Sequence, residues 1–472
     1  MTVVESDENI GEKVIPLRTL FHFAHFTSFY RLYVPAAIAI GIVAGIAMIV
    51  FQFLIVTITL GLSIIPLYIA PIIGGVFSGI LIYFGRREIQ GSGISKAIEM
   101  THEPGSLKSG TALTKLVATS VSIGSGNPVG REGPAVLIGA ALGNSIGRRL
   151  GFHESSHLRV FLMMGSAAAT AGIYKAPLGG ALFATEAPYR RDARLGYFVP
   201  TVIAALTSYI VYALVWGIEP ILQLEASFIL TIDVIPMLII FGLVAGVLSI
   251  FFAVVLMLIR NFFTVKLPDW LDPIAGSFLA CITIFATGLF IDPSLTIAGM
   301  GYEVINNLVD TQVPIMILLM LLIGKLFASS AVVAGRVSGG VLASSLFVGA
   351  MLGAIFGEVF YPYEVGAFIV LGMGAVLGAN TNTPVATTIM MLEMSLSFDL
   401  VIPLALCISV AYLVSGGTSL YEGQKVSRDD EEPGYYRLAD EPTDNQLISV
   451  DDCANPYDPD EKNHEEKGNT SL

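Results

Sequence analysis

The sequence has few charged residues for its length. Only 13% of the 472 residues are charged, whereas 54% are hydrophobic. A soluble domain typically carries about 25% charged residues and rarely exceeds about 250–300 residues, and two soluble domains could not bury so many apolar side chains. The composition therefore excludes a soluble enzyme, a disordered hub and a nucleic-acid-binding protein. It predicts a membrane protein that crosses the bilayer several times.

Cysteine and histidine are also scarce, and their spacing matches no known site. Two cysteines, Cys281 and Cys407, lie within apolar runs, and Cys453 lies near the C-terminus, with no metal-binding or disulfide pattern. All six histidines fall outside the long apolar runs: His22, His25, His102, His153, His157 and His464. We therefore expect no cofactor, no metal and no enzymatic activity such as intramembrane hydrolysis.

Acidic charge is concentrated at the C-terminal end. The net charge is −13, but residues 422–472 hold fifteen acidic and five basic side chains, a balance of −10, so the other residues sum to about −3. The overall acidity therefore does not predict a cationic substrate. We expect residues 422–472 to form a disordered tail. Residues 1–16 are polar and of mixed charge, unlike a signal peptide.

Apolar segments interrupted by glycine and proline fill the rest of the chain. Residues 17–32 mix aromatic and basic side chains, which predicts an amphipathic helix at a membrane face. Several later segments are shorter than the ~20 residues that a helix needs to cross a bilayer, and broken helices occur in membranes only where protein or water covers the backbone. The segments are 33–62, 65–84, 110–123, 133–147, 158–173, 177–186, 196–216, 235–259, 271–291, 313–334, 339–359, 365–379, 383–393 and 398–415.

The chain repeats itself at an interval of about 200 residues. Residues 163–186 match residues 370–393 without a gap at an offset of 207, and residues 89–93 match 297–301 at an offset of 208. Chance matching of glycine and alanine is the alternative to a duplicated half. Duplicated halves with interrupted helices are typical of secondary transporters and related channels, whose substrate site lies between the repeats.

The strongest local signal is GSGNPVGREGP at residues 124–134, directly before an apolar helix pattern. The start of a helix presents unpaired N–H groups and a partial positive charge, which attract an anion. Glu132 stands at this helix start between Arg131 and Gly133. Its carboxylate could occupy the anion position and leave when protonated, as a gate would. On residue type alone, the preferred interpretation of Glu132 is an ordinary acidic residue at a helix start, next to Arg131.

Three further motifs offer neutral donors. GSGIS at residues 91–95 presents the Ser92 hydroxyl and the neighbouring N–H groups, and SGGVLAS at residues 338–344 opens another apolar helix with the N–H groups of Val341 and Leu342. Tyr421 follows the last apolar run, where a membrane-interface tyrosine is also expected. Neutral donors suit transport, because the ion must be held loosely enough to leave. Glu186 and Glu393 are equivalent acidic residues of the two repeats, nine residues after a proline. Each is either a functional charge within a membrane segment or an acid at a helix end near the membrane interface.

Together these motifs resemble the CLC family of chloride channels and chloride/proton antiporters. The resemblance rests on GREGP (130–134), GSGIS, GGVLAS, the two repeat blocks, LEM (392–394) and GGTSLY, and it covers about residues 30–421. It implies an all-α polytopic membrane protein of two inverted repeats with many short, broken helices, homodimeric with one pore per subunit. We expect a cytoplasmic N-terminus with the amphipathic helix at residues 1–32, and the two transmembrane repeats at residues 33–217 and 232–421. Residues 422–472 would form an acidic disordered tail, which is too short for the paired nucleotide-sensing domains of many family members.

The resemblance also implies roles for individual residues. Ser92, flanked by Gly91 and Gly93, and Tyr421 match side chains that donate to the central chloride, and Val341 and Leu342 match backbone donors. Glu132 matches the gating glutamate, which relays the proton in exchangers. The expected partners are chloride, the lipid bilayer, a second copy of the chain and, in an exchanger, protons. The expected location is the cell membrane.

Departures from the family pattern leave the transport mode open. Ser95 replaces a common proline, and Leu342 and Ser344 depart from a common GxFxP pattern. Ala187 stands where well-coupled bacterial exchangers carry an inner proton glutamate, and Glu186 is a possible substitute. We slightly favour chloride/proton exchange; passive chloride conduction and transport of another anion are the alternatives.

Overall fold

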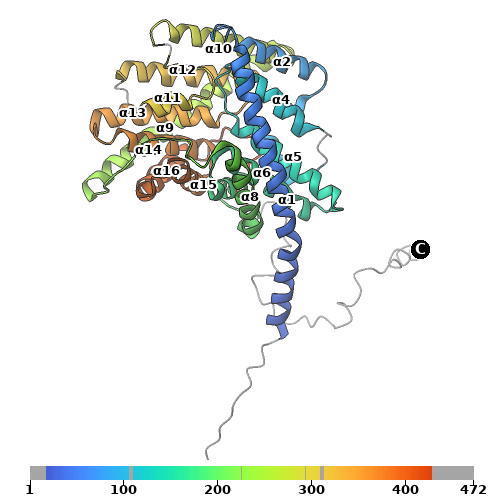
Figure 1. The fold of residues 1–472 in the computed structure, drawn as a ribbon. Coiled ribbons are helices and arrows are strands. Elements are labelled where there is room, and N and C mark those ends of the chain that lie inside the picture. Colours follow the sequence, from blue (N-terminus) through green and yellow to red (C-terminus); the bar gives the residue numbers. More distant parts are fainter. Residues whose placement is uncertain (1–16, 106–109, 225, 293, 309–312, 428–472) are drawn as a thin grey trace, which may run out of the picture. The chain divides into compact units, whose positions relative to one another are not determined.

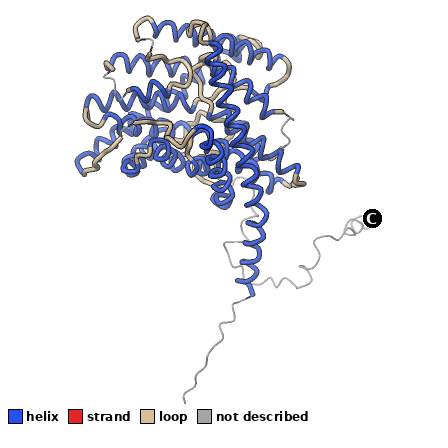
Figure 2. The backbone as a smooth tube through the Cα atoms, in the orientation of Figure 1, coloured by secondary structure: helices blue, strands red, loops and turns tan. Residues whose placement is uncertain are grey.

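The computed structural model describes residues 17–105, 110–224, 226–292, 294–308 and 313–427. Within these ranges the chain consists of helices joined by loops, with two isolated β-bridges and no strand (Figures 1 and 2). The all-α architecture predicted from the sequence is confirmed.

The helices fall into two successive sets. The first set comprises α1 (Leu17–Leu62), α2 (Pro71–Tyr83), η1 (Arg87–Ile89), α3 (Ile94–His102), α4 (Thr111–Gly124), α5 (Glu132–Arg149), α6 (Ser155–Tyr174), α7 (Pro177–Glu186), η2 (Leu195–Tyr197) and α8 (Phe198–Trp216). The second comprises η3 (Ile232–Val234), α9 (Ile235–Lys266), α10 (Asp272–Gly288), α11 (Tyr302–Asn307), α12 (Ile315–Ala334), α13 (Leu342–Phe360), α14 (Val365–Thr381), α15 (Pro384–Ser395), η4 (Phe398–Leu400) and α16 (Val401–Ser415).

Each set repeats the order of the other, which confirms the predicted duplication. α6 and α14 both end in a left-handed residue, Lys175 (φ 51°) and Asn382 (φ 56°), and Pro177 and Pro384 then begin α7 and α15. α1 packs on α8 as α9 packs on α16, and α5 packs on α6 as α13 packs on α14. The equivalent helices α7 and α15 also pack on each other, with the C-terminal end of each at the N-terminal end of the other. Opposite directions of equivalent neighbours are what an inverted repeat requires.

α1 shows how the hydrophobic pattern orients a helix in this fold. Its buried residues recur every three or four positions, as in Ile40, Ala44 and Met48, whereas Ile46 and Phe53 are 51% and 60% exposed. One stripe therefore faces the other helices and the opposite stripe faces outward. The helix expected at 17–32 and the apolar segment 33–62 form one continuous helix; the side chains of residues 17–30 lie outside the described part of the structure.

Long and short helices are mixed. Six helices in the described ranges are long and apolar enough to cross a membrane: Arg31–Leu62, Leu195–Trp216, Ile232–Phe263, Ile315–Ala334, Leu342–Phe360 and Phe398–Ser415. α3, α7 and α15 have only 9, 10 and 12 residues, too few to span a bilayer. Short helices of this kind place their ends inside the protein, where their backbone groups can meet a ligand.

Glycine contacts hold the paired helices at backbone distance. A Cβ atom added to Gly165 in α6 would lie 2.0 Å from the carbonyl oxygen of Gly139 in α5. In the second set, a Cβ on Gly372 in α14 would lie 2.2 Å from the carbonyl oxygen of Gly349 in α13. Small residues let membrane helices approach closely. These glycine pairs therefore hold α5 against α6 and α13 against α14.

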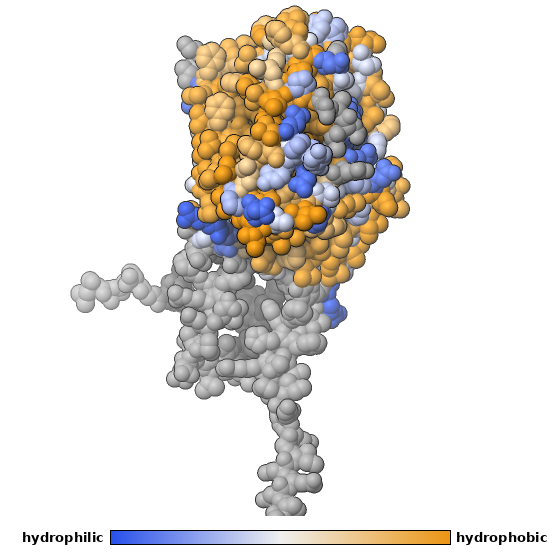
Figure 3. Space-filling view, turned by 90° about the vertical axis from the view of Figure 1, so that its left-hand side faces the viewer, coloured by the Kyte–Doolittle hydropathy of each residue, from blue (hydrophilic) through white to orange (hydrophobic). Residues whose placement is uncertain are grey.

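The face of the helical unit seen in Figure 3 is largely hydrophobic. Along α9, Ile240, Val247 and Leu258 are 49%, 60% and 64% exposed. Exposed apolar area on this scale would be unfavourable in water and suits contact with lipid. Residues 422–427, which we assigned to the tail, pair with residues 188–191 and belong to the helical unit. The expected disorder of residues 428–472 lies outside the described residues.

Candidate functional site

The loops that precede α5 and α13 meet in the middle of the helical unit. Gly130 N–H donates to the carbonyl of Gly340 at 2.7 Å, and Gly340 N–H donates to the carbonyl of Gly130 at 2.8 Å. The Thr119 and Ser338 hydroxyls, also from different repeats, lie 2.8 Å apart. Because the two loops are joined, the N-terminal ends of α5 and α13 converge. Each end carries N–H groups without intrahelical partners and a partial positive charge.

The Gly91–Ser92–Gly93 loop joins the same centre. Gly339 N–H donates to the carbonyl of Gly91 at 3.1 Å, and a Cβ on Gly133 would lie 3.1 Å from Ser92 Cβ and 3.4 Å from Gly340 Cα. The Ser92 hydroxyl oxygen accepts from Ile94 N–H at 3.2 Å. Its own proton therefore stays available for a ligand. The structure thus brings together Ser92, the start of α5 and the start of α13.

A pair of buried lysines, which the sequence analysis missed, supports the two equivalent loops. Lys115 in α4 is fully buried and donates to the carbonyls of Ile89 and Gly91 at 2.7 and 2.6 Å. Lys325 in α12 does the same for Ile297 and Gly299 at 3.0 and 2.6 Å. A charged residue inside an apolar helix is costly and usually functional, so the same rule that singled out Glu132 could have found both lysines.

Val341 and Leu342 lie at the start of α13, as the sequence predicted. Val341 is the residue before the helix and Leu342 is its first residue, and both are buried. Ser344, a departure from the family pattern, donates to the carbonyl of Pro128 at 3.2 Å. This bond ties α13 to the loop before α5, so the serine contributes a cross-repeat contact.

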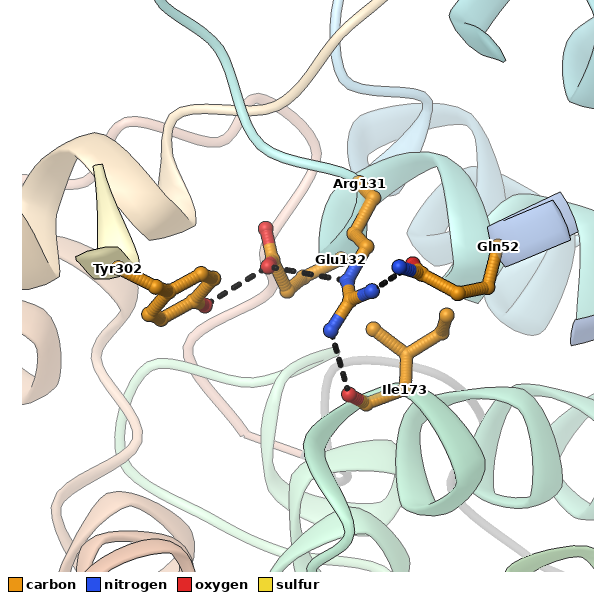
Figure 4. Close-up of polar contacts among 5 residues, drawn as sticks. All are labelled: Gln52, Arg131, Glu132, Ile173 and Tyr302. Atoms are coloured by element: carbon orange, nitrogen blue, oxygen red, sulfur yellow. Dashed lines mark hydrogen bonds and ion pairs between the residues drawn. The ribbon is translucent and has the colours of Figure 1, made fainter. Parts of the chain in front are cut away.

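Glu132 is fully buried as the first residue of α5 (Figure 4). Its Oε1 accepts from the Tyr302 hydroxyl at 2.8 Å and lies 4.0 Å from Nε of Arg131. Its Oε2 has no hydrogen-bond partner in the described part of the chain. A Cβ placed on Gly130 would lie 2.1 Å from this Oε2 and 2.7 Å from Cβ of Ala343. The unpaired oxygen therefore lies where the starts of α5 and α13 meet.

Arg131 turns away from the centre toward other elements. Its Nη1 donates to the side-chain oxygen of Gln52 in α1, and its Nη2 donates to the carbonyl of Ile173 at 3.3 Å (Figure 4). The guanidinium contributes positive charge close to Glu132 and anchors the loop. With Lys115 and Lys325, three basic side chains are buried around one central acid.

Tyr421 completes the group of predicted residues. Its side chain is 3% exposed, and its hydroxyl has no hydrogen-bond partner among the described residues. Glu422 N–H donates to the Ser95 hydroxyl at 3.1 Å, so the serine that replaces the common proline ties the Tyr421 segment to α3. A buried hydroxyl without a partner is unfavourable unless a ligand accepts from it.

Two tyrosines that sequence reasoning missed also surround Glu132. Tyr302 begins α11 and contacts the carboxylate directly. Tyr174, at the end of α6, is fully buried next to Ile173, whose carbonyl accepts from Arg131, and its hydroxyl has no partner in the described ranges. Neither tyrosine stands in a recognisable motif, so nothing in the sequence marked them.

Glu186 lies apart from this centre, at the contact between α7 and α15. Its two carboxylate oxygens accept from Val385 N–H at 3.2 Å and Ala386 N–H at 2.7 Å. Glu393 makes the equivalent contacts with Leu178 N–H at 3.0 Å and Gly179 N–H at 2.8 Å. Each glutamate therefore caps the N-terminal end of a helix of the other repeat.

The sequence and the fold of this chain match proteins of one known family. A family model described as voltage gated chloride channel matches residues 74–416, well over half of the chain. The chain belongs to this CLC family. The resemblance stated from the motifs is therefore confirmed, and the apolar helices make this CLC protein a multi-pass membrane protein.

Relatives and solved structures agree with this assignment. The chain is 28% identical over 366 residues to the voltage-gated ClC-type chloride channel ClcB of Salmonella dublin, covering 74% of this chain and 83% of the relative. It is 24% identical over 399 residues to an uncharacterised protein of Methanocaldococcus jannaschii, and the match covers 84% of this chain and 96% of that relative. A slow cyanobacterial Cl⁻/H⁺ antiporter has the same fold, with a TM-score of 0.71 and 22% sequence identity. The match covers 81% of this chain and 94% of the antiporter chain. A CLC-type fluoride/proton antiporter also has this fold, with a TM-score of 0.73 and 23% sequence identity. The match covers 84% of this chain and 98% of the antiporter chain.

Proposed function

We propose that this CLC protein carries chloride across the bilayer through the converging helix starts, with Glu132 as the gate. The observation that carries the proposal is the unpaired Oε2 of Glu132, which is buried where α5 and α13 begin. A carboxylate oxygen and a chloride ion seek the same N–H donors. The two therefore compete for one position, and protonation of Glu132 removes the competitor.

The donors around this position are suited to passage of the ion. The Ser92 and Tyr421 hydroxyls and the N–H groups of Val341 and Leu342 are neutral, and they hold the ion with partial charges. The buried basic groups Lys115 and Lys325 hydrogen-bond to loop carbonyls and act on the ion only through space. An ion held in this way can leave again, as conduction requires.

We favour coupling of chloride movement to protons. Glu132 can carry a proton across the centre of the site. Glu186, the last residue of α7, is the candidate inner proton site. The structure neighbours include Cl⁻/H⁺ and F⁻/H⁺ antiporters. Passive chloride conduction is the second candidate, and Ala187 favours it: the position next to Glu186 is a buried alanine whose carbonyl accepts from Gln424 at 2.8 Å. The family expectation of a homodimer stays a prediction.

Simultaneous measurement of chloride and proton flux in liposomes tests the proposal. An imposed chloride gradient should drive protons against their own gradient in the wild type. Glu132→Gln, which mimics the protonated gate, should keep chloride flux while losing its pH dependence and its proton movement. Glu303→Gln, an exposed acid on α11, is the matched control and should behave as the wild type.

The outcomes separate the candidate functions. Chloride flux without proton movement in the wild type would refute exchange and leave conduction. Full pH dependence in Glu132→Gln would refute the gate. A competition series of chloride, bromide, nitrate and fluoride tests the ion itself, because preference for fluoride or nitrate would overturn the assignment of chloride.

A further inference from the structure

The two Gly-X-Gly loops carry different side chains at equivalent backbone positions. Residues 91–94 read Gly-Ser-Gly-Ile and residues 299–302 read Gly-Met-Gly-Tyr. Both loops are pinned by a buried lysine and both precede a short helix. The first loop offers its hydroxyl in the middle, on Ser92. The second has a methionine there and offers its hydroxyl two residues later, on Tyr302.

The backbone fixes Tyr302 in place. Gly301 has φ 91°, and a Cβ there would lie 2.4 Å from the ring of Phe347, so only glycine fits before the tyrosine. Lys325 holds the carbonyls of Ile297 and Gly299 just upstream. The phenol is therefore presented to Glu132 from a rigid loop of the opposite repeat.

The contact of Tyr302 is confined to one side of the carboxylate. Its hydroxyl donates to Oε1 of Glu132 at 2.8 Å (Figure 4). Oε2 is unpaired among the described residues and lies 2.1 Å from the position that a Cβ on Gly130 would take. Tyr302 thus holds the gate by the oxygen that does not compete with the anion.

Among the described residues, no other side chain that faces Glu132 holds it in this way. Nε of Arg131 is 4.0 Å from Oε1, beyond hydrogen-bond distance, and Lys325 interacts with the carboxylate only through space while it donates to loop carbonyls. The Tyr174 and Tyr421 hydroxyls make no hydrogen bond among the described residues.

We propose that Tyr302 is the latch of the gate, a positioning residue whose hydroxyl keeps the Glu132 carboxylate at the helix starts and so sets how readily an anion or a proton displaces it. This inference rests on the proposed gating function of Glu132. A hydrogen bond to a carboxylate is roughly twice as strong as one to a neutral acceptor. Protonation of Glu132 therefore weakens the latch as it removes the charge, and the two effects act together to open the gate.

Tyr302→Phe removes the hydroxyl and keeps the ring. A hydrogen bond to a charged group is worth a factor of about ten or more in an equilibrium. We expect chloride flux at neutral pH to rise about tenfold. The pH of half-maximal flux should move upward by about one unit, because the carboxylate form has lost a donor. Tyr363→Phe, a fully exposed tyrosine in the loop between α13 and α14, is the matched control and should change nothing.

A double-variant cycle with Glu132→Ala tests whether Tyr302 acts through the gate. In the Glu132→Ala background, Tyr302→Phe should have no further effect on flux. The same increase in both backgrounds would overturn the latch, because it would mean that the phenol only narrows the pathway. A wild-type pH profile in a Tyr302→Phe protein that elutes as a single species would also overturn it.

The latch and the gate fail in different ways. If Glu132→Ala is independent of pH but Tyr302→Phe matches the wild type, the latch is wrong and the gate stands. If Glu132→Ala keeps the full pH dependence, the proposed gate is wrong, and the latch with it.

Discussion

Lys115 and Lys325 allow one prediction to be tested with an internal control. They occupy equivalent positions, both are fully buried, and each donates to two loop carbonyls. The loop held by Lys115 carries Ser92, a donor to the anion in our proposal, whereas the loop held by Lys325 carries Met300 at that place. Replacing each lysine by methionine, which is similar in length and uncharged, removes the same contacts from both repeats.

The two variants should lose similar stability. Each leaves two carbonyl groups without a donor, at about 1–3 kcal/mol for each buried group, and each removes a buried charge whose desolvation costs several kcal/mol. These opposing contributions are similar in both variants, apart from the contact of Lys325 with the ring of Phe347. We therefore expect similar shifts in thermal unfolding.

Chloride binding should differ between the two variants. If the Ser92 loop relaxes in Lys115→Met, the anion loses one hydroxyl donor, worth about 1.5–3 kcal/mol for a bond to a charged group. The dissociation constant for chloride should then rise by about tenfold or more. Lys325→Met should not weaken chloride binding in this way, because its loop presents no donor to the anion and instead carries Tyr302, which holds the competing Glu132 carboxylate.

Isothermal titration with chloride in detergent, together with thermal unfolding of the same samples, provides the measurement. Equal losses of chloride affinity in the two variants would refute the reasoning, since they would mean that buried positive charge, and not the position of the Ser92 loop, determines binding.

Three further predictions concern the site and its frame. Tyr421→Phe should weaken chloride binding about tenfold with little change in unfolding temperature, because its hydroxyl has no protein partner in the described ranges; unchanged affinity in titration would remove it from the site. Glu186→Gln and Glu393→Gln should destabilise the protein equally, since each loses a helix cap, but only Glu186→Gln should lower proton flux in liposomes. Gly165→Ala should reduce the yield of folded protein by overpacking, about 1–3 kcal/mol, whereas Gly61→Ala, with open space around it, should not.

The repeats explain how one frame holds an asymmetric site. Glu132 and Leu342 are the first residues of equivalent helices, joined by the reciprocal Gly130–Gly340 bonds. A two-fold arrangement of backbones thus brings two helix starts together but supplies a single acid between them. In our proposal only one carboxylate competes for the position, so its protonation opens the site without a second buried charge taking its place.

The sequence by itself determined the fold class, the duplication and most members of the candidate site. Long apolar runs, Gly-rich helix starts and repeated blocks are local patterns, and each follows from hydrophobicity or from the chemistry of helix ends. Ser92, Val341, Leu342 and Tyr421 could be selected in this way. The acid at the start of α5 also stood out, because a charge beside an apolar run is rare.

Only the tertiary structure decided which of these groups meet. The Tyr302–Glu132 bond joins residues 170 positions apart, and the reciprocal caps of Glu186 and Glu393 join the two repeats. Ser95 looked like a departure from a pattern until its contact with Glu422 showed a role. Such contacts depend on how the halves pack, and hydrophobic periodicity fixes which face of a helix is buried but not which residue of the other half lies opposite.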